Sequence, residues 1–352
     1  MRQKILAPAT ATADNGAEGS FASDLQTMGR PLRSVMSMGP RIGPSYRQTP
    51  RAGTRVLRNR QERVQRRSPV VAVLGAVLLL ATMFGCDGLF YHPTRHVYST
   101  PEEHGLEYEP VRIPTPDGLT LDAWFFPAST REPTGTVVHF HGNAANITGH
   151  FPHVAWLPGA GWNLLCFDYR GYGRSEGRPS RPGLVVDGHA VLDYVMSRKD
   201  VDPARVVALG QSLGGAVSIV VVAERRDVAG IAVDGAFSDY RRIASWHLRR
   251  SPLLFPLAGI VPRVLLSDGY APIDSVARIA PRPLFIFHGR EDAIVDPRMA
   301  EELYAAAAEP KELWLIDGEG HYGALQELAE VARPRLLAFF DRCVHDGHRV
   351  SP

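Results

Sequence analysis

Short apolar runs alternate with longer segments of helical spacing over most of the chain. Six runs rich in Val, Ile, Leu and Phe are typical of buried strands, at residues 136–140, 163–169, 205–209, 231–233, 284–287 and 313–316. Helical spacing appears at 184–196, after Ser212, at 299–308 and at 325–343, where Pro334 predicts a break or displacement. This alternation predicts an α/β fold with a mostly parallel central sheet and helices on both faces.

Two segments depart from the alternation. Residues 111–114 and 119–127 flank Asp117-Gly118, which predicts an antiparallel hairpin with this dipeptide at the turn. Residues 240–279 hold apolar groups interrupted by Pro252, Pro256 and Pro262, which predict a small helical cap inserted into the α/β domain. The sequence leaves open whether this cap is an apolar roof over a substrate pocket or simply a packed connection.

Composition and charge divide the chain into unequal parts. Of its 352 residues, 45% are hydrophobic and 22% are charged, which is enough apolar material for a substantial core. Residues 1–68 carry 13 Lys and Arg against 4 Asp and Glu, whereas the rest of the chain carries 26 against 33. The first 68 residues are aperiodic and rich in Gly, Pro, Ser and Thr. This composition predicts a disordered basic extension, or a translation start assigned too far upstream.

A basic arm for nucleic acid or anionic lipid is the functional alternative for this extension. The arginines lack the regular interleaving of aromatic residues that stacking on bases needs, so we expect no nucleic-acid partner. The three cysteines are widely spaced and form no disulfide framework or metal-binding pattern. Cys166 falls in a predicted strand and is expected to be buried, and Cys343 falls in the closing helix.

An uncharged run of about 15 apolar residues, 70–84, follows the arginines. It is shorter than the roughly 20 residues of a membrane span and fits the hydrophobic part of an export signal. It ends in Met83-Phe84-Gly85-Cys86, which resembles a bacterial lipobox and predicts lipidation at Cys86. Residues 69–86 are therefore expected to be a signal or anchor segment, with an uncleaved anchor or a buried helix as alternatives. With either a signal or an anchor, residues 87–352, the predicted α/β domain, would be membrane-anchored and face the periplasmic side.

The stretch Gly210-Gln211-Ser212-Leu213-Gly214 joins a predicted strand to a predicted helix and fits the pattern G-x-S-x-G. A serine on so sharp a turn brings the backbones of strand and helix together, which leaves no room for Cβ atoms at the two glycines. A second match, centred on Ser175, is followed by two prolines that prevent a helix from starting there. Ser212 is therefore the predicted nucleophile.

A serine nucleophile needs a base that takes its proton and an acid that orients the base. His321 is the predicted base, because it lies in a glycine-rich loop after the last predicted strand. Asp292 lies in the loop after the preceding strand and is the predicted acid, with Glu291, Asp296 and Asp234 as rivals. The order serine, aspartate, histidine is the one found with this serine motif.

Two backbone N–H groups are expected to bind the anion that forms when a carbonyl group is attacked. The N–H of Leu213 starts the helix after the nucleophile, and Asn143 follows Gly142 in the loop after the strand at 136–140. His141 also lies in this loop, where we expect it to brace the backbone rather than act as a base.

With these residues in place, the chain resembles the α/β-hydrolase superfamily, and most closely its serine aminopeptidase-like branch, which also holds membrane-associated depalmitoylating hydrolases. The resemblance covers about residues 105–345 and rests on residues 141–146, 167–173, 210–215, 288–292 and 320–321. It implies hydrolysis of an ester, thioester or amide through an acyl-enzyme, with neither a metal nor an organic cofactor. The natural substrate does not follow from it.

The expected function is that of a serine hydrolase acting on small carboxylic esters or thioesters, with lipid-like acyl groups favoured by the apolar cap and the nearby anchor. A serine peptidase or aminopeptidase is the alternative among enzymes. A catalytically silent hydrolase fold that serves as a binding protein is the alternative outside enzymes, and the complete set of Ser212, Asp292 and His321 argues against it.

Overall fold

The structure, a computed structural model, describes residues 75, 90–266 and 269–346. The predicted extension at 1–68 and Cys86 lie outside these residues, as does all of the segment at 69–86 except Gly75. No helix within the described part of the chain combines the length and the apolar character needed to cross a bilayer.

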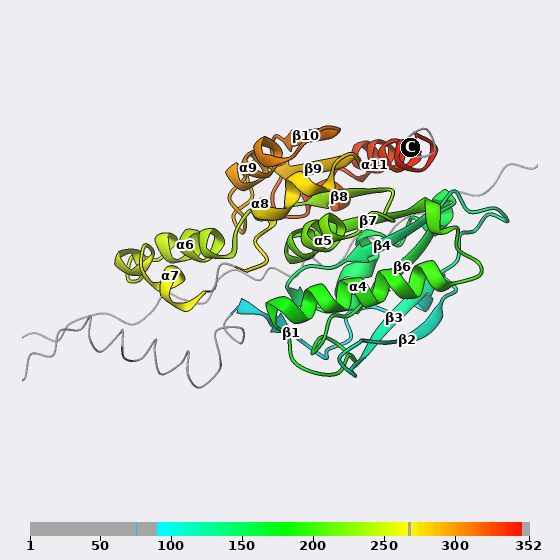
Figure 1. Cartoon of the computed structure of the whole chain (residues 1–352), viewed down its shortest axis with the longest axis horizontal. Coiled ribbons are helices and arrows are strands. Elements are labelled where there is room, and N and C mark those ends of the chain that lie inside the picture. The colour runs from blue at the N-terminus through cyan, green and yellow to red at the C-terminus, as the bar shows by residue number, and fades with distance from the viewer. Residues whose placement is uncertain (1–74, 76–89, 267–268, 347–352) are drawn as a thin grey trace, which may run out of the picture. The chain divides into compact units, whose positions relative to one another are not determined.

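A single sheet of eight strands forms the centre of the described domain, in the order β10-β9-β8-β7-β4-β6-β3-β2 (Figure 1). Its strands are β2 (Glu109–Pro114), β3 (Thr120–Phe126), β4 (Thr136–Phe140), β6 (Asn163–Phe167), β7 (Val206–Gln211), β8 (Gly230–Asp234), β9 (Leu284–Gly289) and β10 (Lys311–Ile316). β3 runs antiparallel to both of its neighbours, and the other paired strands are parallel. The predicted α/β fold and hairpin are therefore confirmed.

Helices cover both faces of this sheet (Figure 1). One face packs against α4 (Arg181–Ser197), α5 (Leu213–Glu224) and α9 (Arg298–Ala306), and the other against α3 (Ile147–His150), η2 (Phe151–His153) and α11 (Ala329–Asp346). Along β7, Val206 and Ala208 belong to the first apolar cluster, whereas Val207 and Leu209 belong to the second. Burial on both faces explains why the strands read as continuous apolar runs.

Short elements join these layers. β1 (His92–Pro93) pairs in parallel with β5 (Ala144–Ala145), so the chain that precedes the central sheet is attached to the loop after β4. Three of the 3-10 turns lie in connections between these layers: η1 (Pro101–His104), η3 (Pro158–Ala160) and η4 (Pro203–Arg205).

The predicted insertion at 240–279 is helical, but its two halves differ. α6 (Tyr240–Arg250), η5 (Phe255–Leu257) and α7 (Val261–Leu265) come first, and α6 and α7 lie together beyond the sheet and its flanking helices (Figure 1). α8 (Pro272–Ser275) and η6 (Val276–Ile279) instead pack against α5, with Val276 and Ile279 buried in the core. Residues 240–266 are called the outer cap below. Tyr240 and Ile243 at the start of α6 join the core, and the remainder of the segment lies mostly beyond it.

The predicted break of the closing helix near Pro334 is wrong. The interruption comes earlier, at residues 327–328, between α10 (Gly323–Gln326) and α11, and α11 continues through Pro334. Proline removes one backbone hydrogen bond from a helix, but burial of Leu336, Phe339 and Phe340 against the sheet outweighs that cost. Cys166 in β6 is buried, as predicted, and Cys343 in α11 is buried as well.

Candidate active site

Ser212 lies at the corner between β7 and α5 with φ 52° and ψ −112°. A residue that carries a Cβ adopts this region only under strain, at a cost on the order of 1–3 kcal/mol. The Ser212 N–H donates to the carbonyl of Asp234 at 2.8 Å, which helps to hold the corner. A Cβ on Gly210 would collide with the backbone of the new helix, and one on Gly214 with the carbonyl of Phe140. The steric reason for the two glycines is therefore confirmed.

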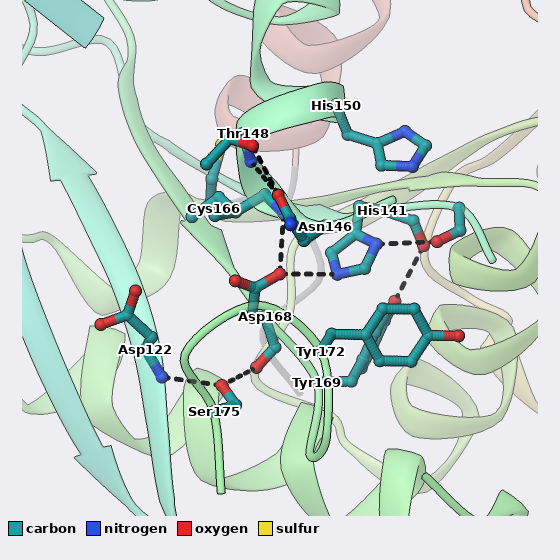
Figure 2. Close-up of polar contacts among 12 residues, drawn as sticks. Asp122, His141, Asn146, Thr148, His150, Cys166, Asp168, Tyr169, Tyr172 and Ser175 are labelled. Atoms are coloured by element: carbon teal, nitrogen blue, oxygen red, sulfur yellow. Dashed lines mark hydrogen bonds and ion pairs between the residues drawn. The ribbon is translucent and has the colours of Figure 1, made fainter. Parts of the chain in front are cut away.

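Ser175, the rejected alternative, is buried and has a structural role (Figure 2). Its hydroxyl donates to the carbonyl of Asp168 at 2.7 Å and accepts from the N–H of Asp122 at 2.8 Å. These two bonds attach the loop after β6 to strand β3, so the hydroxyl is already engaged.

The structure brings His321 and Asp292 together, with Nδ1 of the imidazole 2.6 Å from Oδ2 of the carboxylate. The same oxygen lies 3.0 Å from Nε2 of His288, and Oδ1 accepts from the N–H groups of Ile294 and Val295 at 2.7 and 2.9 Å. Burial by itself would raise the pKa of Asp292, but the hydrogen bonds from His288 and His321 outweigh it and hold the pKa well below its usual range. Asp292 is thus an ionised carboxylate that fixes the ring of His321.

The three rival acids lie in other environments. Glu291 is exposed, and Asp296 accepts from the N–H of Arg298 at the start of α9. Asp234 is buried at the end of β8, and burial raises its pKa to about 6. Because the hydrogen bond of His321 is made to Asp292, the geometry favours Asp292 over all three.

Sequence reasoning missed two side chains at this site, His288 and Tyr322. His288 is fully buried at the end of β9, where it is the second imidazole on Asp292. Tyr322 has φ 68°, and its ring lies against His321 with centroids 4.1 Å apart. Burial raises the pKa of the Tyr322 phenol, and a hydrogen bond with the Ser212 side chain partly offsets this effect. A Cβ on Gly142 would collide with the same phenol oxygen.

The two predicted oxyanion donors, Leu213 and Asn143, line one cavity together with Ser212. The side chain of Asn143 holds its loop: Nδ2 donates to the carbonyl of Phe90 at 2.6 Å, and Oδ1 accepts from the N–H of His92 and the hydroxyl of Tyr172 at 3.1 and 2.8 Å. The side chain is therefore engaged, which leaves the backbone N–H of Asn143 for the predicted role in anion binding.

His141 lies between Asp168 and the backbone of the loop after β4 (Figure 2). Its Nδ1 is 2.7 Å from the carbonyl oxygen of Gly142, and its Nε2 is 3.4 Å from Oδ1 of Asp168. That same carboxylate oxygen accepts from the N–H of Ile147 at 2.7 Å. His141 and Asp168 thus brace both ends of the loop that carries Gly142 and Asn143, in line with the predicted bracing role.

The cavity in front of Ser212 has a volume of about 410 Å³. The outer cap supplies much of its wall, and the side chains are mainly apolar: Phe237, Ile243, Leu248, Val261, Leu265 and Leu266. Among the described residues that line the cavity there is no Asp or Glu. Such a cavity suits an apolar group next to a polar reacting centre.

The fold, with a serine corner, a histidine paired with a buried aspartate and a covering cap, defines a protein of the α/β-hydrolase class. The comparisons with known proteins agree. The family described as "Serine aminopeptidase, S33" matches residues 131–278. An esterase structure from Pyrococcus furiosus superposes with a TM-score of 0.60, at 23% identity, over 72% of this chain and 98% of that one. The chain belongs to the α/β-hydrolase superfamily, as its sequence motifs predict.

Its relatives extend across bacteria and eukaryotes. The uncharacterized protein YfhR of Salmonella typhi is 37% identical over 266 residues, which is 71% of this chain and 86% of the relative. The protein bem46 of Schizosaccharomyces pombe is 29% identical over 226 residues, 63% of this chain and 73% of the relative. These likenesses support a hydrolase and leave the bond that it cleaves to be argued from the site.

Proposed function

We propose that the protein is a serine hydrolase that cleaves carboxylic ester or thioester bonds through an acyl-enzyme on Ser212. The observation that carries this proposal is the hydrogen bond of 2.6 Å between His321 and Asp292. The same carboxylate is held ionised by backbone and imidazole donors, next to a cavity that contains the strained serine. Ionised Asp292 keeps the Nδ1 proton on His321 and leaves Nε2 as the base.

The reaction proceeds in two halves. Nε2 of His321 accepts the hydroxyl proton while Oγ of Ser212 attacks the carbonyl carbon, and the N–H groups of Leu213 and Asn143 stabilise the negative oxygen. The carbonyl then re-forms, the bond to the leaving alcohol or thiol breaks, and His321 returns the proton to that group. In the second half, water loses a proton to His321 and attacks the acyl-enzyme, which releases the acid and restores the Ser212 hydroxyl.

The lining of the cavity favours an apolar acyl group over an amino-terminal peptide. An aminopeptidase needs a negative group to hold the substrate's ammonium, whereas no carboxylate is found among the described lining residues. The family description names a serine aminopeptidase, so amide hydrolysis stays the second candidate. The superposed Pyrococcus furiosus protein is an esterase, which supports the first.

The test is a substrate panel with the detergent-extracted full-length protein. We expect turnover of p-nitrophenyl esters of varied acyl length and of acyl thioesters, but not of aminoacyl anilides. Ser212→Ala is expected to abolish both turnover and labelling by a fluorophosphonate, whereas Ser197→Ala, on the exposed end of α4, keeps both. Labelling that persists in Ser212→Ala would refute the assignment, and turnover of anilides alone would favour the peptidase.

We also propose that residues 69–86 are a lipoprotein signal that is removed up to Cys86, and that lipid on Cys86 tethers the hydrolase domain to a membrane on the periplasmic side. The support is the uncharged run at 70–84 followed by the lipobox-like Met83-Phe84-Gly85-Cys86. The mass of the intact protein extracted from membranes tests this: we expect a chain that begins at Cys86 and carries added acyl mass. A mass that includes residues 1–85 with no addition contradicts lipidation.

A further inference from the structure

Large apolar side chains are exposed along one short stretch of the outer cap. Leu253, Phe255, Ile260 and Val264 are 76%, 58%, 61% and 70% exposed. Single exposed apolar residues are common on soluble proteins, but four within twelve consecutive residues indicate a surface that something covers.

Helix α7 is apolar on two sides. Val261, Pro262 and Leu265 line the cavity in front of Ser212, whereas Val264 points to solvent. Apart from Arg263, α7 carries only apolar side chains, and apolar helix surfaces are normally buried. The inner side of α7 is accounted for by the cavity, and its outer side needs a second apolar environment.

The charge of the outer cap identifies that environment. Residues 240–266 contain five arginines and neither Asp nor Glu. Arg242 pairs with Glu302 of α9, and Arg241 donates to the carbonyl of Leu266. Arg249, Arg250 and Arg263 are exposed; the first two precede the apolar stretch and Arg263 lies within it. Apolar side chains flanked by arginines match a bilayer that carries anionic headgroups, since the surface supplies negative charge and the layer beneath supplies apolar contact.

We propose that the outer cap docks on the surface of an anionic lipid bilayer, with Leu253, Phe255, Ile260 and Val264 inserted below the headgroups. The cavity lies on the other side of the same helix, so an acyl chain in the bilayer has a short path to Ser212. This second step rests on the proposed function, whereas the docking itself does not. A protein surface or a second copy of the chain is the competing occupant.

Local hydrogen exchange in full-length Ser212→Ala tests the docking without any turnover. The protein is reconstituted in vesicles of phosphatidylcholine and in vesicles that also contain phosphatidylglycerol, so that any N-terminal tether acts equally in both. We expect peptides covering 251–264 to exchange about tenfold more slowly on the anionic vesicles, while peptides of α11 around the exposed Val331 do not change.

Two double variants separate charge from apolar contact. Arg249→Gln with Arg250→Gln should remove the difference between the two lipids, and Leu253→Ser with Phe255→Ser should remove protection on both. Equal exchange of residues 251–264 with and without vesicles overturns the proposal. So does protection that appears without lipid and grows with protein concentration, which indicates a second copy.

The same double variants, made in the protein that keeps Ser212, test delivery of substrate from the bilayer to the cavity. Turnover of a long-chain ester embedded in anionic vesicles should fall about tenfold or more, while turnover of soluble p-nitrophenyl butyrate stays within about twofold, because none of the four residues lines the cavity. If butyrate is not hydrolysed even by the parent protein, the proposed function fails, and the exchange experiment still decides the docking. An equal loss on both substrates contradicts the delivery step.

Discussion

The phenol of Tyr322 lies next to both the Ser212 hydroxyl and Gly142, where the oxygen of an attacked carbonyl would develop charge. His150 and His153 pack around its ring, with centroids 6.1 and 6.0 Å from it. Burial raises the pKa of the phenol, so it keeps its proton at neutral pH and can donate. Tyr322→Phe is expected to lower kcat about tenfold or more with little change in KM, because a donor to the transition state is lost.

Steady-state kinetics on a soluble ester measure this effect. Tyr304→Phe, on α9, removes a hydroxyl away from the site and serves as the matched control. An unchanged kcat in Tyr322→Phe, or a rise in KM alone, would show that the phenol does not act on the transition state.

Asp234 provides a pH test of stability. Burial raises its pKa to about 6 from an ordinary value of 3.8, so the folded chain binds this proton more tightly than the unfolded chain does. The carboxyl therefore favours the folded state while it is protonated, and its contribution is lost as the pH rises from about 4 through 6. Asp234→Asn should raise the free energy of unfolding at pH 7.5 by on the order of 2 kcal/mol relative to the parent, with little change at pH 4.

Urea denaturation at several pH values checks this expectation. Asp341→Asn, at an exposed position of α11, is the control that should leave the pH profile as it is. A difference between Asp234→Asn and the parent that is constant from pH 4 to pH 8 would contradict the buried titration.

The sequence allowed Ser212, Asp292 and His321 to be chosen because each follows a predicted strand in a loop with a local signal. His288 gave no comparable signal, since a histidine that ends an apolar strand looks like any buried strand residue. Tyr322 depends on its left-handed backbone and on contacts with Gly142 and Ser212, which come from distant parts of the chain. Such contacts exist only once the strands are side by side.

At the scale of elements, the approach of α5 to β4 sets the geometry of the corner. Gly214 passes so close to the carbonyl of Phe140 that a methyl group does not fit. Gly214→Ala is expected to lower the free energy of unfolding by about 3 kcal/mol or more, because α5 has to move away from the sheet. Gly159→Ala in η3, where an added Cβ meets nothing within 4 Å, should change it far less.

Urea denaturation followed by circular dichroism compares the two glycine variants. Equal stability of Gly214→Ala and Gly159→Ala would mean that the corner tolerates a Cβ at position 214 and that the glycine there is required for another reason.

Elements that depend on local periodicity were predicted better than those that depend on packing. The parallel strands and α4, α5 and α9 were found close to their true bounds. The helix break predicted at Pro334 was wrong because helix propensity counts only the loss of one backbone hydrogen bond. In the structure, burial of its side chains against the sheet stabilises α11. The insertion was found, but the return of α8 and η6 to the core was not, since apolar cap and apolar core residues look alike in a sequence.

At the scale of the whole described domain, the candidate site is gathered along one edge of the sheet. Asn143, Ser212, Asp292 and His321 follow β4, β7, β9 and β10 in turn. The sequence predicted that these loops share an edge, because the carboxyl ends of parallel strands point the same way. It did not predict the strand order or that Asp234, after β8, would lie between them as a buried acid.

The outer cap is one uninterrupted length of chain, while the reacting groups come from four separate loops. Replacing the outer cap with the corresponding segment of a relative would exchange the proposed lipid-facing surface and much of the cavity wall in one step. The nucleophile, base and acid would stay as they are. The segment that shapes substrate selectivity is thus separate in sequence from the catalytic residues, and evolution or an engineer can replace it as one continuous piece.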